Sequence, residues 1–282
     1  MEKTTILNDY IFKQVFGRQE NEKILISFLN AMLDGDYKIK RAKVITPEMP
    51  RINEMARTVL LDTQVQTDDG TYIDIEVQQG YRQDLIDRML IYGAKMLSEH
   101  SEKATMFDSI KCISIWILNC SMPEFDIFKQ DPIIGQFCFR STLNGSTYLP
   151  LQGLTIYPIE LKKGTNIKNI STFKETWINF LRSSTGVSKP EEIEEVHDAY
   201  DKMLKVAGSP EYRAYKNALD KAEQLKKNDI AWAREDGIAE GEHQKAIDTA
   251  KKLLKKNLSI EDIAECTGLT TKEVKSLVKN SD

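Results

Sequence analysis

Two acidic residues, Asp62 and Glu76, lie in neighbouring stretches of the chain in which apolar and polar residues alternate with a period of two. The stretches span residues 59–66 and 71–79 and predict two β-strands joined by a tight turn. On the second strand, the alternation places Gln78 on the same face as Glu76. Two carboxylates that face each other across a strand pair repel, and a divalent metal ion would neutralise them. A polar hairpin face exposed to water explains the pattern equally well, so both interpretations stay open.

The length of the turn decides how the two strands pair. A two-residue loop at Asp69 and Gly70 would mix the apolar and polar faces, whereas a three-residue loop over residues 68–70 keeps the apolar face intact. Because an apolar face normally specifies the register, we predict the three-residue loop. The predicted pairs are Leu61 with Val77, Asp62 with Glu76, Thr63 with Ile75, Gln64 with Asp74 and Val65 with Ile73. Asp74 is then expected either behind the metal ligands or exposed to water.

The histidines and cysteines offer no alternative catalytic set. The three histidines, His100, His197 and His243, have neither catalytic nor metal-ligand spacing, so any catalysis is expected to depend on carboxylates. The four cysteines show no CxxC spacing and lie in apolar or helical contexts, which indicates reduced thiols of a cytoplasmic protein. They are Cys112, Cys120, Cys138 and Cys266.

Length and charge limit the classes of protein that fit. The chain has 282 residues, of which 41% are hydrophobic, which is enough for one large core and a smaller module. Its net charge of −4 and pI near 5.6 give no overall basic field, so binding to nucleic acid must come from local patches. The longest apolar run, residues 112–118, has the length of a strand, so we expect neither a signal sequence nor a membrane span.

Helix and strand patterns alternate over the first two thirds of the chain. Apolar residues at helical spacing predict helices, and alternating or continuous apolar runs predict strands around the hairpin. The expected helices span residues 8–17, 21–33, 83–99, 172–182 and 191–206, and the expected strands span residues 40–46, 111–119, 136–141, 147–148 and 154–161.

From residue 210 onward the chain is charged and almost entirely helical in pattern. Gly237 and Gly241 predict an interrupted or mobile connector. Two short helices follow, with capping-box pairs at Ser259 and Asp262 and at Thr270 and Glu273, and Gly268 lies in the turn between them. We therefore expect a main domain at residues 1–185, a helical connector at 186–242 and a helix-turn-helix-like module at 243–282.

The C-terminal module allows two interpretations. As a DNA reader, its second helix would present Lys272 and Lys275 to a groove or to the phosphate backbone. Acidic residues between positions 261 and 273 dilute that charge, so a small module for dimerisation or packing is the other interpretation.

The order of helix, strand, acidic hairpin, long helix and apolar strand resembles the αβββαβ core of the PD-(D/E)XK phosphodiesterase superfamily. Asp62, followed by Glu76-Val77-Gln78 on the next strand, resembles the D…(D/E)xK pattern of that superfamily, with Gln78 in the place of the lysine. Residues 8–17, 26–33, 73–78, 237–241 and 259–269, with Arg88 and Tyr92, resemble the Rpn family of recombination-promoting nucleases and transposases. The resemblance implies an α/β fold of restriction-endonuclease type, with a mixed central sheet flanked by helices and a helical C-terminal region.

The resemblance also implies a catalytic site. By the family pattern, Asp62, Glu76 and the Val77 carbonyl would bind Mg²⁺, with Mn²⁺ as a substitute. The ion would neutralise charge on the phosphoryl oxygens and supply or orient the attacking hydroxide. Gln78 can position a water by hydrogen bonds but brings no positive charge. An E-x-Q ending is usual in the Rpn-like group, so the departure bears on the rate of the reaction more than on its type.

Four further residues are candidates for this site. Glu22 could be the additional acid that some relatives carry on an early helix, and a first-turn glutamate favoured by the helix dipole is the other interpretation. Asp9 has the same ambiguity, because N-terminal capping suffices to explain it. Arg88 and Lys95 could contact DNA phosphates, or they could be solvated cations that flank a buried helix stripe.

These observations together favour a Mg²⁺-dependent DNA endonuclease that hydrolyses phosphodiester bonds and serves recombination or mobile-element functions. The alternative is a nucleic-acid-binding or regulatory protein on a nuclease scaffold, with little or no catalysis. The expected partner is DNA rather than a membrane, and the expected location is the cytoplasm. A homodimer would provide the two active sites that double-strand cleavage needs.

Overall fold

The computed structural model describes residues 5–33, 37–45, 63–101, 110–124, 136–143, 146–163, 171–183 and 193–279. The chain divides into two compact units, Met1–Arg213 and Ala214–Asp282. Within the described ranges, no helix combines the length and the apolar character needed to cross a membrane.

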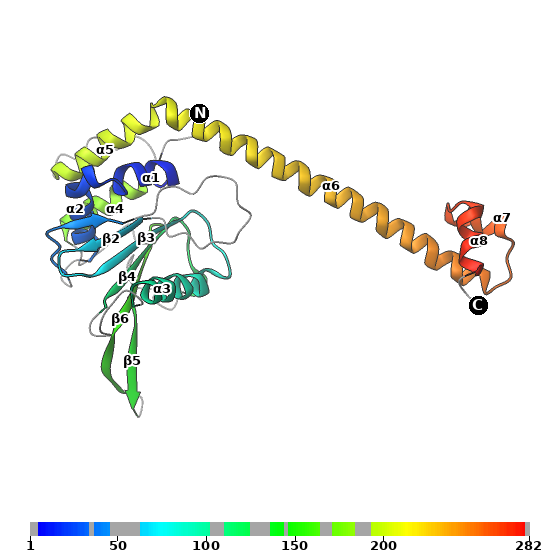
Figure 1. Cartoon of the computed structure of the whole chain (residues 1–282), viewed down its shortest axis with the longest axis horizontal. Helices are drawn as coiled ribbons and strands as arrows, with labels where there is room; N and C mark the ends of the chain where they lie inside the picture. The colour runs from blue at the N-terminus through cyan, green and yellow to red at the C-terminus, as the bar shows by residue number, and fades with distance from the viewer. Residues whose placement is uncertain are drawn as a thin grey trace. The chain divides into compact units, whose positions relative to one another are not determined.

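Six strands among the described residues form one mixed sheet in the first unit (Figure 1). They are β1 (Ala42–Val44), β2 (Thr63–Thr67), β3 (Tyr72–Gln78), β4 (Cys112–Leu118), β5 (Phe137–Leu143) and β6 (Ser146–Glu160). Their order across the sheet is β1-β2-β3-β4-β6-β5, in which β3, β4 and β6 are parallel and the outer pairings are antiparallel. Every residue of β4 is buried, which explains its almost continuous apolar sequence.

Helices cover both faces of the sheet (Figure 1). One face shares a large core with α1 (Asp9–Phe16), α2 (Glu22–Met32), α4 (Thr172–Arg182) and α5 (Glu194–Ala207). A short 3-10 turn, η1 (Gln19–Asn21), precedes α2. The other face packs against α3 (Leu85–Ser101), whose buried residues meet the side chains of Trp116, Leu118 and Leu154. The expected mixed sheet with flanking helices is therefore confirmed.

Side-chain caps begin two of the helices in the first unit. The Asn8 side chain caps α1 by accepting a hydrogen bond from the Ile11 N–H, and Gly17 follows the last residue of that helix. Ser171 caps α4 in the same way, because its hydroxyl accepts a hydrogen bond from the Lys174 N–H.

The hairpin between β2 and β3 has the predicted three-residue loop. Gly70 has a φ of 83°, a left-handed conformation that glycine adopts without steric strain. The Thr67 N–H donates to the Thr71 carbonyl at 2.9 Å, which closes the loop. The predicted pairs Thr63–Ile75, Gln64–Asp74 and Val65–Ile73 are confirmed. Leu61 and Asp62 lie outside the described residues, so their pairing stays a prediction.

Strand β6 and helix α6 (Pro210–Leu254) are both longer than expected. β6 pairs with β5 from Ser146 to Ile156 and with β4 from Leu154 to Glu160. These two neighbours support one continuous strand, whereas the sequence predicted two separate strands in this region. The prediction of an interruption at Gly237 and Gly241 is wrong, since α6 runs through both glycines. Each glycine costs a helix only about 1 kcal/mol relative to alanine, and strong helix formers surround these two.

Helix α5, which the sequence-based division placed in the connector, belongs to the main core. It packs against α1, α2 and α4. Its residues Val196, Ala199 and Met203 are buried there. The compact first unit consequently extends to Arg213.

In the second unit, the end of α6 packs against α7 (Ile260–Thr267) and α8 (Thr271–Lys279) around Ala250, Ile263, Leu269 and Val274. The predicted capping box at Thr270 and Glu273 is complete, whereas at Ser259 only the side-chain cap of the helix is formed. The Ser259 hydroxyl accepts a hydrogen bond from the Asp262 N–H at 3.1 Å. The Thr270 hydroxyl accepts one from the Glu273 N–H, while the Glu273 carboxylate accepts one from the Thr270 N–H. Gly268, with a φ of 73°, ends α7.

Candidate active site

Asp74, Glu76 and Gln78 alternate along β3 and face the side of the sheet that α3 covers. Asp74 is fully buried, and Glu76 is only 5% exposed. The polar face of the hairpin is therefore covered at these positions, and the interpretation as a solvated face is wrong for both carboxylates. Of the two expectations for Asp74, exposure to water is therefore wrong.

A chain of hydrogen bonds crosses from β4 to the buried Asp74. Ser114 is the register partner of Asp74 in the parallel pair, and its hydroxyl donates to Asp74 Oδ2 at 3.3 Å. The Trp116 indole N–H donates to the Ser114 hydroxyl at 2.8 Å. Trp116 is in turn the register partner of Glu76. These contacts fix polar groups beneath α3 on the sheet face that carries Glu76.

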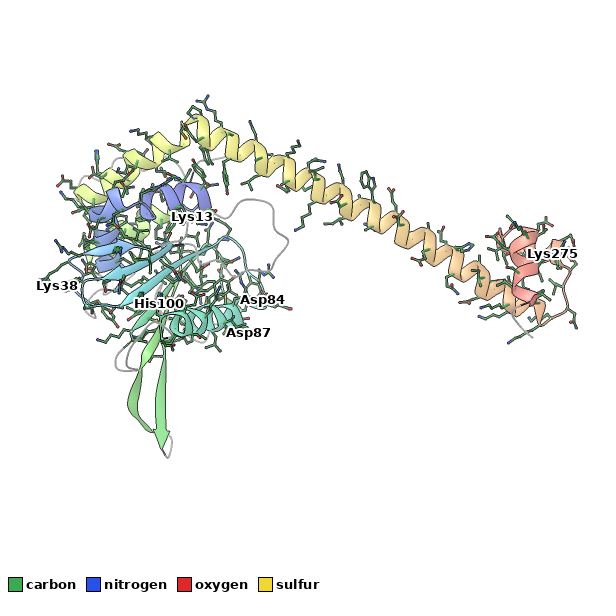
Figure 2. All side chains as sticks on the ribbon, in the orientation of Figure 1. Lys13, Lys38, Asp84, Asp87, His100 and Lys275 are labelled. Carbon is green, nitrogen blue, oxygen red and sulfur yellow. The ribbon has the colours of Figure 1, made fainter. Side chains whose placement is uncertain are left out.

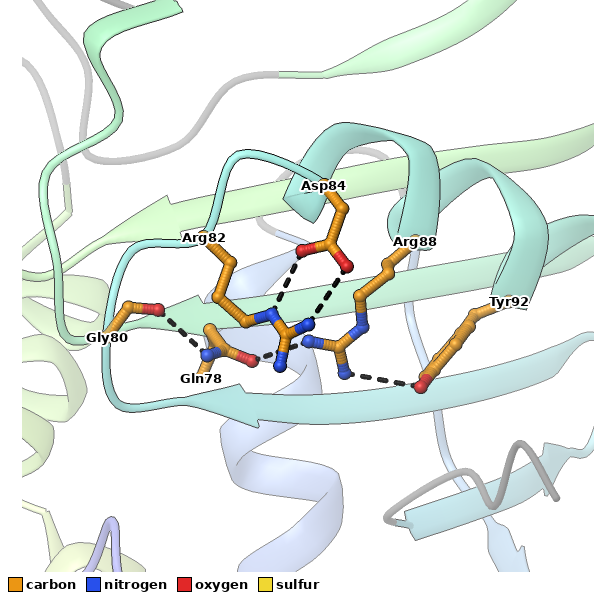
Figure 3. A network of polar contacts seen from close by, with 6 residues as sticks. All are labelled: Gln78, Gly80, Arg82, Asp84, Arg88 and Tyr92. Carbon is orange, nitrogen blue, oxygen red and sulfur yellow. Dashed lines mark hydrogen bonds and ion pairs between the residues drawn. The ribbon is translucent and has the colours of Figure 1, made fainter. Parts of the chain in front are cut away.

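Arg88 on α3 contacts Gln78 at the end of β3 (Figure 3). One terminal guanidinium nitrogen, Nη1, donates to Gln78 Oε1 at 3.2 Å, and the other, Nη2, donates to the Tyr92 hydroxyl at 3.2 Å. The Gln78 amide nitrogen donates to the Gly80 carbonyl at 2.8 Å. Both ends of the Gln78 amide are thus held, with its oxygen toward the cation.

The loop that leads into α3 contains a separate ion pair. Arg82 binds Asp84 through two hydrogen bonds, from Nε at 2.9 Å and from Nη2 at 3.1 Å (Figure 3). The hydrogen bonds from Arg82 hold the pKa of the Asp84 carboxyl below its ordinary value. The Asp84 carbonyl also accepts the Arg88 N–H at 2.9 Å, so this loop fixes the beginning of the helix that carries Arg88.

The two additional acids occupy structural positions on the helices that cover the opposite face of the sheet. The Glu22 carboxylate accepts a hydrogen bond from the Ala42 N–H at 2.8 Å, which fastens α2 to the edge strand β1. Asp9 is half exposed and forms an ion pair with Lys13 at 3.0 Å. The structure brings neither acid to Glu76 through any contact that we observe in the described residues.

The predicted phosphate contacts lie in two different units. Lys95 is on α3 and forms an ion pair with Glu99 at 3.5 Å. Lys272 and Lys275 are exposed on α8 in the second unit, where Figure 2 labels Lys275. Of the predicted cations, only Arg88 contacts a predicted site residue in the part of the chain that the structure describes.

The metal-binding set is described only in part. Glu76 and Val77 are consecutive residues of β3, whereas Asp62 lies outside the described residues. In the described ranges, no group of three or more His, Cys, Asp or Glu residues could hold a metal ion. The Glu76 carboxylate and the Val77 carbonyl are oxygen donors of the kind that Mg²⁺ prefers, and they are two of the three expected ligands.

Two residues that shape this site were not singled out from the sequence. Ser114 and Trp116 lie within the apolar run of β4, which indicated only burial. Ser114 is the one hydroxyl residue in that seven-residue strand, and a buried hydroxyl needs a hydrogen-bond partner. The need of the Ser114 hydroxyl for a partner could therefore have indicated a polar neighbour on β3.

The comparisons with known proteins agree with this geometry. A family model described as "PD-(D/E)XK nuclease family transposase" matches residues 6–234, which is most of the chain and includes the hairpin and α3. Neither the curated proteins nor the solved structures give a match. The resemblance stated from the sequence is confirmed, and the chain belongs to the PD-(D/E)XK nuclease family of transposases.

Proposed function

We propose that this protein is a metal-dependent DNA endonuclease that hydrolyses phosphodiester bonds in recombination or mobile-element transfer. The observation that carries the proposal is the register of the hairpin together with the burial of Glu76. The pairs Thr63–Ile75 and Gln64–Asp74 follow the predicted register, and Glu76 is buried under α3 at the end of β3. Membership of a nuclease family supports hydrolysis as the reaction.

In this proposal Asp62, Glu76 and the Val77 carbonyl hold Mg²⁺ or Mn²⁺. The bound ion would neutralise charge on the phosphoryl oxygens and lower the pKa of a coordinated water. Gln78 orients the attacking water through its amide oxygen, which has a second lone pair beside the one that Arg88 engages. Glu22 and Asp9 remain additional candidates of lower priority, because each already has a structural partner.

DNA binding is assigned to cations on two elements. Arg88 and Lys95 on α3 would contact phosphates near the site, and Lys272 and Lys275 on α8 would contact the backbone elsewhere. A DNA-reading role for the module at residues 243–282 and a homodimer belong to the same proposal. Binding through phosphates is expected to weaken steeply as salt rises.

The test is nicking of supercoiled plasmid with Mg²⁺ or Mn²⁺ by the wild-type chain and by Asp62→Asn and Glu76→Gln. Loss of a hydrogen-bond partner outside the coordination sphere costs about 10–100-fold, so loss of a ligand is expected to cost at least about 100-fold. Asp87→Asn is the matched control, because Asp87 is exposed in the first turn of α3. Its activity is expected to equal that of the wild type.

Metal binding gives a second measurement that does not depend on cleavage. Titration calorimetry with Mn²⁺ is expected to detect binding to the wild type and to Asp87→Asn, and much weaker binding to Glu76→Gln. A wild-type chain that binds DNA but neither binds Mn²⁺ nor nicks plasmid would contradict the enzyme and favour a nucleic-acid-binding protein on a nuclease scaffold.

A further inference from the structure

The guanidinium group of Arg88 lies on the same face of the sheet as Glu76. Its central carbon is 5.2 Å from the centroid of the Tyr92 ring and 5.9 Å from that of Trp116. Trp116 is the register partner of Glu76, and Gln78, which accepts a hydrogen bond from Arg88, follows Glu76 by two residues on the same strand face. The cation therefore lies beside two aromatic rings and is hydrogen-bonded to the Gln78 amide.

The groups that Arg88 contacts by hydrogen bonds or ring contacts are all neutral in the part of the chain that the structure describes, although the cation also attracts the Asp84 carboxylate through space. They are the Gln78 amide oxygen, the Tyr92 hydroxyl and the two rings. Asp84, a carboxylate at the start of the same helix, is already bound by Arg82 through two hydrogen bonds. The hydrogen bonds to Gln78 and Tyr92 use two of the five N–H donors of this half-buried guanidinium, so further N–H donors remain for an anion.

Gln78 stands where the D…(D/E)xK pattern of the superfamily has a lysine, so β3 itself supplies no cation at that position. We propose that Arg88 supplies the missing positive charge to the scissile phosphate, and that Gln78 positions Arg88. This inference rests on the proposed nuclease function. It goes beyond a general phosphate contact, because it assigns Arg88 to the reacting phosphate and explains why a neutral residue is tolerated on β3.

The role of Arg88 follows from where charge develops. The oxygen of a water molecule forms a bond to phosphorus, one ester P–O bond breaks, and the leaving oxygen takes a proton from solvent while the attacking water releases one. Negative charge increases on the non-bridging oxygens during this exchange. Arg88 donates hydrogen bonds to such an oxygen, and its contacts with Gln78 and Tyr92 fix it before the substrate arrives.

The experiment compares Arg88→Gln with Arg18→Gln in steady-state cleavage of a labelled duplex by the full chain. Arg88→Gln removes the charge and keeps a polar side chain, whereas Arg18→Gln removes an exposed guanidinium that donates to Gln14 near the end of α1. We expect kcat to fall by about 100-fold in Arg88→Gln, as for loss of one transition-state donor. KM is expected to stay within about threefold, and Arg18→Gln is expected to behave as the wild type.

A rescue variant separates a catalytic charge from a structural role. Gln78→Lys places a cation on β3, so Gln78→Lys combined with Arg88→Gln is expected to regain at least about tenfold in kcat over Arg88→Gln alone. Because Arg88 is one of several proposed phosphate contacts, DNA affinity in EDTA, measured by fluorescence anisotropy, is expected to fall far less in Arg88→Gln than kcat does. Equal urea midpoints establish that the variants are folded.

The outcomes of these measurements distinguish a failure of the Arg88 inference from a failure of the proposed nuclease function. An Arg88→Gln variant that matches Arg18→Gln in kcat, one that loses only DNA affinity, or a double variant with no gain in kcat would overturn the inference. A folded wild type that neither binds Mn²⁺ nor cleaves DNA overturns the proposed function itself, and the role of Arg88 with it. Cleavage by the wild type with an unaffected Arg88→Gln overturns the inference alone.

Discussion

Gly93 on α3 and Leu154 on β6 are in such close contact that no side chain fits between them. A β-carbon built at Gly93 would lie 2.8 Å from both Cδ atoms of Leu154. Leu154 is itself buried in the core between α3 and the sheet, so its methyl groups have little room to move. This contact sets how closely α3 approaches the strands, and α3 also carries Arg88.

Gly93→Ala is expected to destabilise the protein by about 1–3 kcal/mol through overpacking, reduced by up to about 1 kcal/mol because alanine favours the helix. Urea unfolding measures the change. Leu154→Val shortens the facing side chain. The loss of stability in the double variant is therefore expected to be smaller than the sum of the losses in the two single variants. Additive effects would show that the two residues do not constrain each other.

Gly70→Ala tests the hairpin that carries the candidate ligands. The φ of 83° places alanine in a left-handed conformation that costs about 1–2 kcal/mol. Gly70→Asn is expected to cost less, because asparagine tolerates this conformation. Gly80→Ala is the control, since Gly80 has no positive φ and a β-carbon there meets nothing within 4 Å. Equal losses at Gly70 and Gly80 would contradict a role for the backbone conformation.

The hairpin was predictable because its determinants are local. Alternation fixed the two faces, and Asp68, Asp69 and Gly70 allowed only one loop that kept the apolar face together. Helix α1, the helix cap at Ser259 and the capping box at Thr270 were predictable for the same reason, since each needs only residues within a few positions along the chain.

The burial of the acidic face was not predictable, because it depends on which side of the sheet α3 covers. The sequence indicated both the polar face of β3 and the apolar stripe of α3. It did not indicate that α3 packs over that polar face. The contact between Arg88 and Gln78 is a consequence of the same packing. Gly237 and Gly241 misled for a different reason: glycine marks loops on average, yet a long exposed helix absorbs two of them.

Burial raises the pKa of the Cys112 thiol from its ordinary value of 9.0 to about 12. Between pH 9 and pH 12 the thiol keeps its proton in the folded chain but loses it in the unfolded chain. The contribution of the buried neutral thiol to the free energy of unfolding is therefore complete below pH 9 and is lost as the pH rises toward 12. Cys112→Ala is expected to reduce the loss of stability over that range, as measured by urea midpoints against the wild type.

Alkylation provides the complementary measurement. The thiolate is the reactive form, so iodoacetamide at pH 8 is expected to modify the exposed Cys266 well before the buried Cys112. Peptide mass spectrometry distinguishes the two sites. Comparable rates in the folded protein, with equal rates after unfolding in urea, would show that Cys112 is accessible.

Ser114→Ala tests the polar chain beneath α3. The variant removes the acceptor of the Trp116 indole N–H and a donor to the buried Asp74, and each buried group that loses its partner costs about 1–3 kcal/mol. Ser98→Ala, on the exposed side of α3, is the control and is expected to stay within about 0.5 kcal/mol of the wild type. Because Asp74 and Glu76 share a strand face, Ser114→Ala is also expected to weaken Mn²⁺ binding. A variant as stable as Ser98→Ala would show that the Ser114 hydroxyl contributes nothing to holding this face of β3 in place.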